Sequence, residues 1–87
     1  MAELHLPRTL QPLFADLPHR LELDAATVGE ALDELDRRWP GLRDRLCEPG
    51  PALRQHIHVY VDRRRAQLGT ELEARSRVDV ITAISGG

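Results

Sequence analysis

The hydrophobic period of this chain changes twice along its length, and this change constrains the fold more than any other feature. Residues 20–24 (RLELD) and 56–61 (HIHVYV) alternate apolar and polar side chains, as half-buried β-strands do. Between them, apolar residues recur at three- and four-residue spacing over residues 28–39, as on one face of an α-helix. The sequence therefore predicts one main helix with strands before and after it in the chain.

The helix carries its own start and stop signals. Thr27 and Glu30 are spaced as a capping box, in which the threonine hydroxyl accepts a hydrogen bond from a first-turn amide and the glutamate reaches back to the cap. Pro40-Gly41 ends the helix, and residues 42–46 predict a further short helical turn with a leucine at each end. The apolar stripe of the main helix consists of Val28, Ala31, Leu32, Leu35 and Trp39.

Alternation also predicts the strands and their faces. Residues 4–6 and 20–24 predict a hairpin with a loose loop, and residues 78–84 predict the last strand. One face of residues 56–61 carries Ile57, Val59 and Val61, and the other carries His56, His58 and Tyr60. One face of the last strand carries Val78, Val80, Thr82 and Ile84, and the other carries Asp79, Ile81 and Ala83.

The connections complete the fold prediction. Residues 48–51 read as a loop, 62–65 as a turn and 68–70 as an irregular crossing. Short connections around a single helix-on-sheet core predict an α+β domain of the β-grasp, or ubiquitin-like, type. Its mixed sheet would have four to five strands and would pack on one main helix, with a short second helical turn. We expect residues 1–84 to form this domain and residues 85–87 to form a flexible tail.

Composition excludes several classes of function. The chain has 87 residues and a net charge of −2, so it lacks the basic excess that general nucleic-acid binding needs. No apolar run approaches the roughly 20 residues of a membrane span, and the first residues do not read as a signal peptide. We therefore expect a cytoplasmic protein with neither a nucleic-acid nor a membrane partner. All twelve basic residues are arginine, so the chain has no side-chain amine.

The side chains predict no catalytic site, no metal site and no bound cofactor. His56 and His58 lie on one strand face, but no third metal ligand is evident, and polar residues that face a partner are the simpler interpretation. Cys47, the single cysteine, has no base near it in the sequence and cannot form an internal disulfide. Arg63–Arg65 read as a solvated turn or as a contact for an acidic partner.

The carboxyl end differs from the rest of the chain, because a predicted strand leads directly into Ser85-Gly86-Gly87. Glycine has no Cβ and accepts backbone angles that other residues refuse, so such a tail can enter a narrow channel. These three residues could reach about 10 Å beyond the strand at about 3.3–3.6 Å per residue. A terminal carboxylate that is activated by adenylation becomes open to attack by a sulfur or nitrogen nucleophile. The alternative is that the glycines mark an artificial or truncated end.

With these features together, the chain resembles the ubiquitin-like sulfur carriers of the MoaD/ThiS family over essentially its whole length. The most similar group within the family is the carriers of O-phosphoserine-dependent cysteine synthesis, followed by the small subunits of molybdopterin synthase. The resemblance lies in residues 6–12 (LPRTLQP), 27–42 (TVGEALDELDRRWPGL), 57–62 (IHVYVD) and 78–87 (VDVITAISGG).

The resemblance implies a protein cosubstrate that is not itself an enzyme. An E1-like enzyme would use ATP to adenylate the Gly87 carboxylate, and a sulfide or persulfide donor would displace AMP to leave a thiocarboxylate. The carrier would then deliver sulfur to a synthase of the cysteine, molybdopterin or thiamin pathway. Gly86 and Ser85 would enter the partner's channel. The candidate docking face is His58 and Tyr60 or Val80 and Thr82, according to which face of the sheet is outward.

Two other functions remain compatible with the sequence. A ubiquitin-like modifier would join its terminal glycine to lysines of target proteins, and its reaction also begins with adenylation. An interaction domain of the same fold would need no particular residues at its tail.

Overall fold

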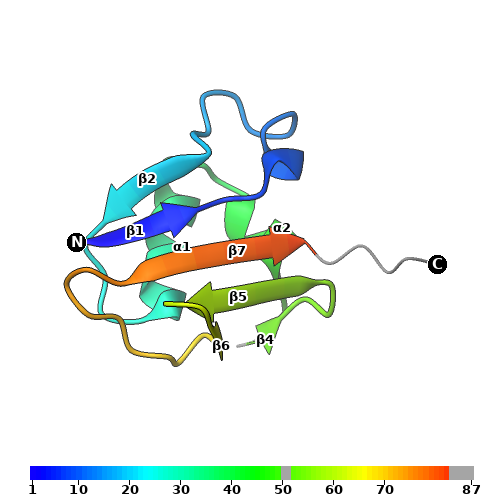
Figure 1. Cartoon of the computed structure of the whole chain (residues 1–87). Helices are drawn as coiled ribbons and strands as arrows, with labels where there is room; N and C mark the ends of the chain where they lie inside the picture. Colours follow the sequence, from blue (N-terminus) through cyan, green and yellow to red (C-terminus); the bar gives the residue numbers. More distant parts are fainter. Residues whose placement is uncertain (50–51, 83–87) are drawn as a thin grey trace.

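A five-stranded mixed sheet with one helix across one of its faces forms the body of the protein (Figure 1). The computed structural model describes residues 1–49 and 52–82, so the tail and the last two residues of the predicted final strand lie outside the described residues. The strand order is β2-β1-β7-β5-β6, in which β1 and β7 run parallel and the other neighbours run antiparallel. The strands are β1 (Ala2–His5), β2 (Arg20–Leu23), β5 (Ile57–Val61), β6 (Arg64–Ala66) and β7 (Arg77–Thr82).

The main helix, α1 (Val28–Arg38), begins where the capping signal predicts. The Thr27 hydroxyl accepts a hydrogen bond from the Glu30 amide at 3.1 Å, as predicted. The Glu30 carboxylate accepts a hydrogen bond from the same hydroxyl at 3.5 Å, so the glutamate reaches back to the side chain of the cap residue Thr27. Two further first-turn amides donate to the backbone of the segment before β7, Val28 N to Thr70 O at 3.0 Å and Gly29 N to Leu68 O at 2.8 Å. The helix start is therefore fixed by both local and distant partners.

The core lies between α1 and the sheet. Trp39 is partly buried at its edge, and the short helix α2 (Leu42–Leu46) adds the fully buried Leu42 and Leu46, as its spacing predicts. From the helix, the buried stripe is Val28, Ala31, Leu32 and Leu35; from the sheet, it includes Leu4, Leu23, Val59 and Val78.

Two regions differ from the prediction. The predicted turn at residues 62–65 is shorter, because Asp62 and Arg63 alone turn with φ of 49° and 72°, and Arg64 already begins β6. Positive φ at both central positions is the geometry of a tight two-residue hairpin, which usually carries Asn or Gly, so the sequence lacked the usual signal. The second region is a small sheet of β3 (Cys47–Glu48) and β4 (Ala52–Leu53) around the predicted loop. A single turn of 3-10 helix, η1 (Arg8–Leu10), follows β1.

The topology confirms the predicted β-grasp fold. A hairpin, a helix that crosses one face of the sheet, and a final strand that returns to the centre beside β1 define this arrangement. The sheet has five strands, the upper end of the predicted range. None of the helices in the described part of the chain has both the length and the apolar character needed to cross a bilayer.

We expect Thr27→Ala to lower the free energy of unfolding by about 1 kcal/mol, because the Glu30 amide loses its acceptor at the helix start. Urea denaturation followed by circular dichroism measures this change. Thr27→Ser keeps the hydroxyl and should remain close to the parent chain. Equal stability of the alanine and serine variants would contradict a stabilising cap.

Candidate functional site

The central strand β7 leads directly to the residues predicted to carry the chemistry. Ser85, Gly86 and Gly87 lie outside the described residues, and Thr82 is the last residue before that part of the chain. Thr82 pairs with Ile57 of β5, and its hydroxyl lies 3.4 Å from the hydroxyl of Thr9, just after β1. The point from which the tail starts is therefore held from both sides of β7.

Two hollows lie on either side of Thr82. The first, about 410 Å³, is bounded by the η1 region, α2 and the start of β5. The second, about 370 Å³, lies on the side of β1 and contains His5, His19 and Ile81. Thr9 and Thr82 line both hollows, so the contact between their hydroxyls separates the two.

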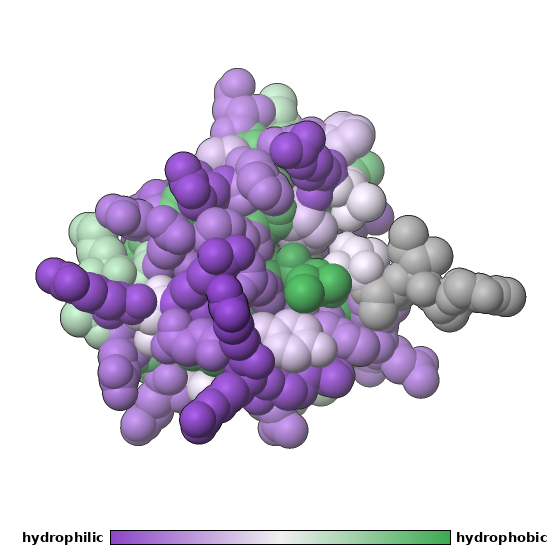
Figure 2. Space-filling model, in the orientation of Figure 1, coloured by the Kyte–Doolittle hydropathy of each residue, from purple (hydrophilic) through white to green (hydrophobic). Residues whose placement is uncertain are grey.

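The face of the sheet opposite α1 is open (Figure 1). His58 and Tyr60 are on this face, where the strand register places His58 opposite Ile81 and Tyr60 opposite Asp79. Ile81 is 45% exposed, which is unusual for a large aliphatic side chain in a central strand. Figure 2 looks onto this face and shows a mainly hydrophilic surface with an isolated hydrophobic spot over the end of β7.

The four candidate docking residues do not form one surface. Val80 is 4% exposed and points to the covered face, where it pairs with Val59. Thr82 has the same orientation by strand alternation and is only partly exposed at the sheet's end. Of the two predicted alternatives, the structure places His58 and Tyr60 on the outward face. The prediction that the Val80 side chain contacts a partner is wrong, because this side chain is buried.

A pair of histidines and one carboxylate occupy the β1 side of the open face. His5 Nε2 donates to Glu3 Oε1 over 2.7 Å, and this hydrogen bond lowers the pKa of the Glu3 carboxyl. The His5 and His19 rings meet edge to face with 6.4 Å between their centroids. Sequence reasoning did not select these residues or Ile81. The sequence did contain a signal for Ile81, because this apolar residue shares one face of the last strand with the charged residues Arg77 and Asp79.

The side chains of the described residues offer little chemistry of their own. Cys47 is 3% exposed, and burial raises the pKa of its thiol, so the reactive thiolate is disfavoured. His56 lies just before β5, and His58 is on the open face. No group of three or more potential metal ligands comes together among residues 1–49 and 52–82.

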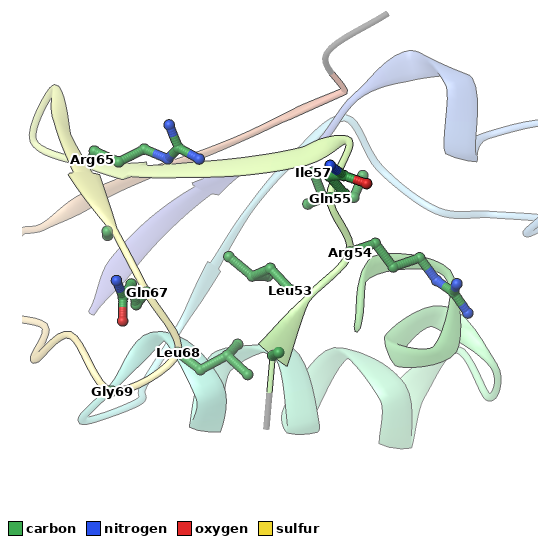
Figure 3. A pocket seen from close by; sticks show the side chains of 10 residues that line it. Leu53, Arg54, Gln55, Ile57, Arg65, Gln67, Leu68 and Gly69 are labelled. Carbon is green, nitrogen blue, oxygen red and sulfur yellow. The ribbon is translucent and has the colours of Figure 1, made fainter. Parts of the chain in front are cut away.

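A further groove, about 460 Å³, lies between β4 and the segment that follows β6. Figure 3 shows the side chains of Leu53 and Leu68 between these two segments, and Arg54 extending away from them. The other lining residues include Gln55 and Gln67. Among the described residues that line it, this groove brings together no acid–base pair and no nucleophile.

Comparisons with known proteins agree with this fold. The small archaeal modifier protein 1 of Haloferax volcanii is 35% identical over 83 residues, which cover 86% of this chain and 95% of that protein. The crystal structure of SAMP1 from Haloferax volcanii matches with a TM-score of 0.76 and 31% identity, over 99% of this chain and 98% of that chain.

A chain from the crystal structure of the Amycolatopsis orientalis BexX/CysO complex matches with a TM-score of 0.85 and 24% identity, over 100% of both chains, which supports the β-grasp fold alone. The ThiS family model matches residues 6–87, which include nearly all of the described body and the terminal diglycine. This match and the identity to small archaeal modifier protein 1 show that the chain belongs to the ThiS family of ubiquitin-like sulfur carriers and modifiers.

Proposed function

We propose that this protein is a sulfur carrier whose working group is the carboxylate of Gly87. The observation that carries the proposal is the family match, which extends through Gly86 and Gly87. In the described body, the one cysteine of the chain, Cys47, is buried, so its thiol is not presented at the surface. The reactive groups other than the terminus are therefore assigned to partner enzymes.

The proposed chemistry has two steps. In an E1-like enzyme, an oxygen of the Gly87 carboxylate attacks the α-phosphorus of ATP, and pyrophosphate leaves. Hydrosulfide then attacks the acyl carbon, and AMP leaves with the bridging oxygen, so that a thiocarboxylate remains on Gly87. A persulfide donor would form an acyl disulfide first, and a further thiol would have to cleave its sulfur–sulfur bond.

The position of β7 suits this role. Residues 83–87, which follow Thr82 and end with the proposed reactive carbon of Gly87, are five residues, and a fully extended segment of this length spans about 17 Å. Because Thr82 is held by Ile57 and Thr9, the body fixes where such a segment starts. A sulfur-accepting synthase would take up the same segment, and the outward residues His58 and Tyr60 would belong to the surface that docks.

The second candidate function is protein modification, favoured by the 35% identity to small archaeal modifier protein 1. Here the lysine amine of a target would attack the adenylate in place of sulfur, and an amide would form. Both functions use the same activated terminus, so one chain can serve both.

We expect the purified chain to gain the mass difference between sulfur and oxygen when it is incubated with the activating enzyme of its host, magnesium-ATP and sulfide. Intact-protein mass spectrometry measures the change, and fragmentation assigns it to Gly87. A reaction without ATP is the control. An unchanged mass with an enzyme that activates another carrier would contradict the proposal, as would a natural chain that continues beyond Gly87.

Gly86→Ala should slow this reaction by about tenfold or more, because a Cβ next to the reactive residue disturbs its alignment in a narrow channel. Gly69→Ala is the matched control, since a Cβ at Gly69 would meet no atom within 4 Å. The measurement is the initial rate of pyrophosphate release. Equal rates for the two variants would argue against the entry of the tail into a narrow channel of the activating enzyme.

If the chain also acts as a modifier, tryptic digestion of host proteins should leave residues 78–87 attached to target lysines, because Arg77 is the last arginine. Mass spectrometry identifies such branched peptides. None should map to this chain itself, since its twelve basic residues are all arginine. A branched peptide on a side chain of this protein would contradict the expectation of single-copy modification.

A further inference from the structure

We propose that the hollow beside Thr82, between the η1 region, α2 and the start of β5, receives carboxylate side chains from the rim of a partner's channel. We call this hollow the basic hollow and define it by Arg45, Arg54 and His56, which line it together with Asp44. The inference rests on the proposed function, because it takes residues 83–87 as the segment that enters the partner.

The reach of the tail decides which surface a partner must touch. A five-residue segment spans at most about 17 Å, so a partner that draws Gly87 into a buried active site must bring its channel mouth close to Thr82. Thr82 lines the basic hollow, and Figure 1 shows the end of β7 on the same side of the molecule as α2. The rim of the channel therefore meets the residues of this hollow.

The charge of the basic hollow determines which side chains the rim of the partner's channel must carry. Among the described residues of the lining, Arg45 and Arg54 outnumber the single carboxylate of Asp44, although the whole chain has a net charge of −2 with histidine counted as neutral. The hollow is thus locally basic on a slightly acidic protein. Carboxylates are the groups that fit it, since guanidinium pairs with them through charge-assisted and bidentate hydrogen bonds.

The Arg54 side chain is held in a fixed position. Its Nε donates to the backbone oxygen of Asp44 at 2.8 Å, and its own amide donates to Leu46 O at 2.9 Å. These bonds direct the side chain over α2 and away from the leucine-lined groove, as Figure 3 shows. Because Nε uses only one of the five guanidinium N–H groups, the two terminal nitrogens remain to bind a carboxylate.

Arginines near the main helix have a different role. Arg37 and Arg38 both pair with Glu34, and Arg43 pairs with Asp33, so internal carboxylates already neutralise them. Within the described residues, no carboxylate lies within ion-pair distance of the Arg45 or Arg54 guanidinium. Six other arginines of the described residues also have no ion pair: Arg8, Arg20, Arg63, Arg64, Arg65 and Arg75. Arg45 and Arg54 differ from these in that they line one hollow together with Thr82, where a partner has to approach.

The hollow also has an apolar border. Leu13 is 52% exposed and lines it, with the buried Leu10 and Ile57 beneath. A hollow that combines charged side chains with an exposed leucine is better suited to bind the surface of another protein than to bind a free small anion. The occupant is accordingly a segment of a partner protein that carries Asp or Glu side chains next to an apolar group.

Nuclear magnetic resonance can test this on the full chain without any partner enzyme. The probe is a capped hexaglutamate peptide, titrated into the isotope-labelled protein at low salt. We expect the amide signals of Arg45, His56 and Thr82 to shift together. The double variant Arg45→Gln/Arg54→Gln should weaken binding about fivefold or more, as the loss of two exposed charge pairs predicts. The matched control, Arg37→Gln/Arg38→Gln, should bind like the parent chain.

Three results would overturn the proposal. The first is shifts that centre on Arg63–Arg65, which would place the acidic contact at the hairpin turn. The second is equal weakening by both double variants, which would mean only general attraction to a basic side chain. The third is no binding. Because the titration uses neither ATP nor sulfur, its failure leaves the mass-shift assay of Gly87 unaffected, and the two proposals can fail separately.

Discussion

The parallel pairing of β1 with β7 is the constraint on which the rest of the structure depends. Leu4 lies beside Val78, and Glu3 N donates to Ser76 O at 2.9 Å, so segments from the two ends of the chain lie side by side. Parallel neighbours cannot be joined by a tight turn and need a crossover over one face of the sheet. The helix α1 is part of that crossover, and its apolar stripe covers the sheet face that the pairing creates.

This pairing also determines where function can reside. The strand β7 lies at the centre of the sheet, and its last residue, Thr82, pairs with Ile57 of β5 and contacts the Thr9 hydroxyl. The body around it offers an exposed Ile81, histidines and arginines, which suit recognition. It buries its only thiol, Cys47. In the proposed function, this scaffold presents the carboxyl end of the chain to partner enzymes.

Local signals in the sequence predicted most of the fold. The capping residues and the apolar stripe predicted α1 and its buried face, because a helix cap and a helical stripe each depend on residues within four positions of one another. Alternation gave β2, β5 and the orientation of Val59 against His58. Where a signal was atypical, prediction was wrong: Asp62 and Arg63 adopt positive φ without being Asn or Gly, so β6 was taken for part of a turn. The two-residue strands β3 and β4 are too short to show a period.

The sequence by itself determined the types of the longer elements, the core composition and the special character of the terminal diglycine, since each depends on residues close to one another in the chain. Only the tertiary structure decided which face of the sheet is open, and so removed Val80 from the docking surface. It also brought Thr9, Arg45 and Arg54 together around Thr82. Such groupings come from strand order and helix packing, which depend on contacts between distant segments that no local pattern encodes.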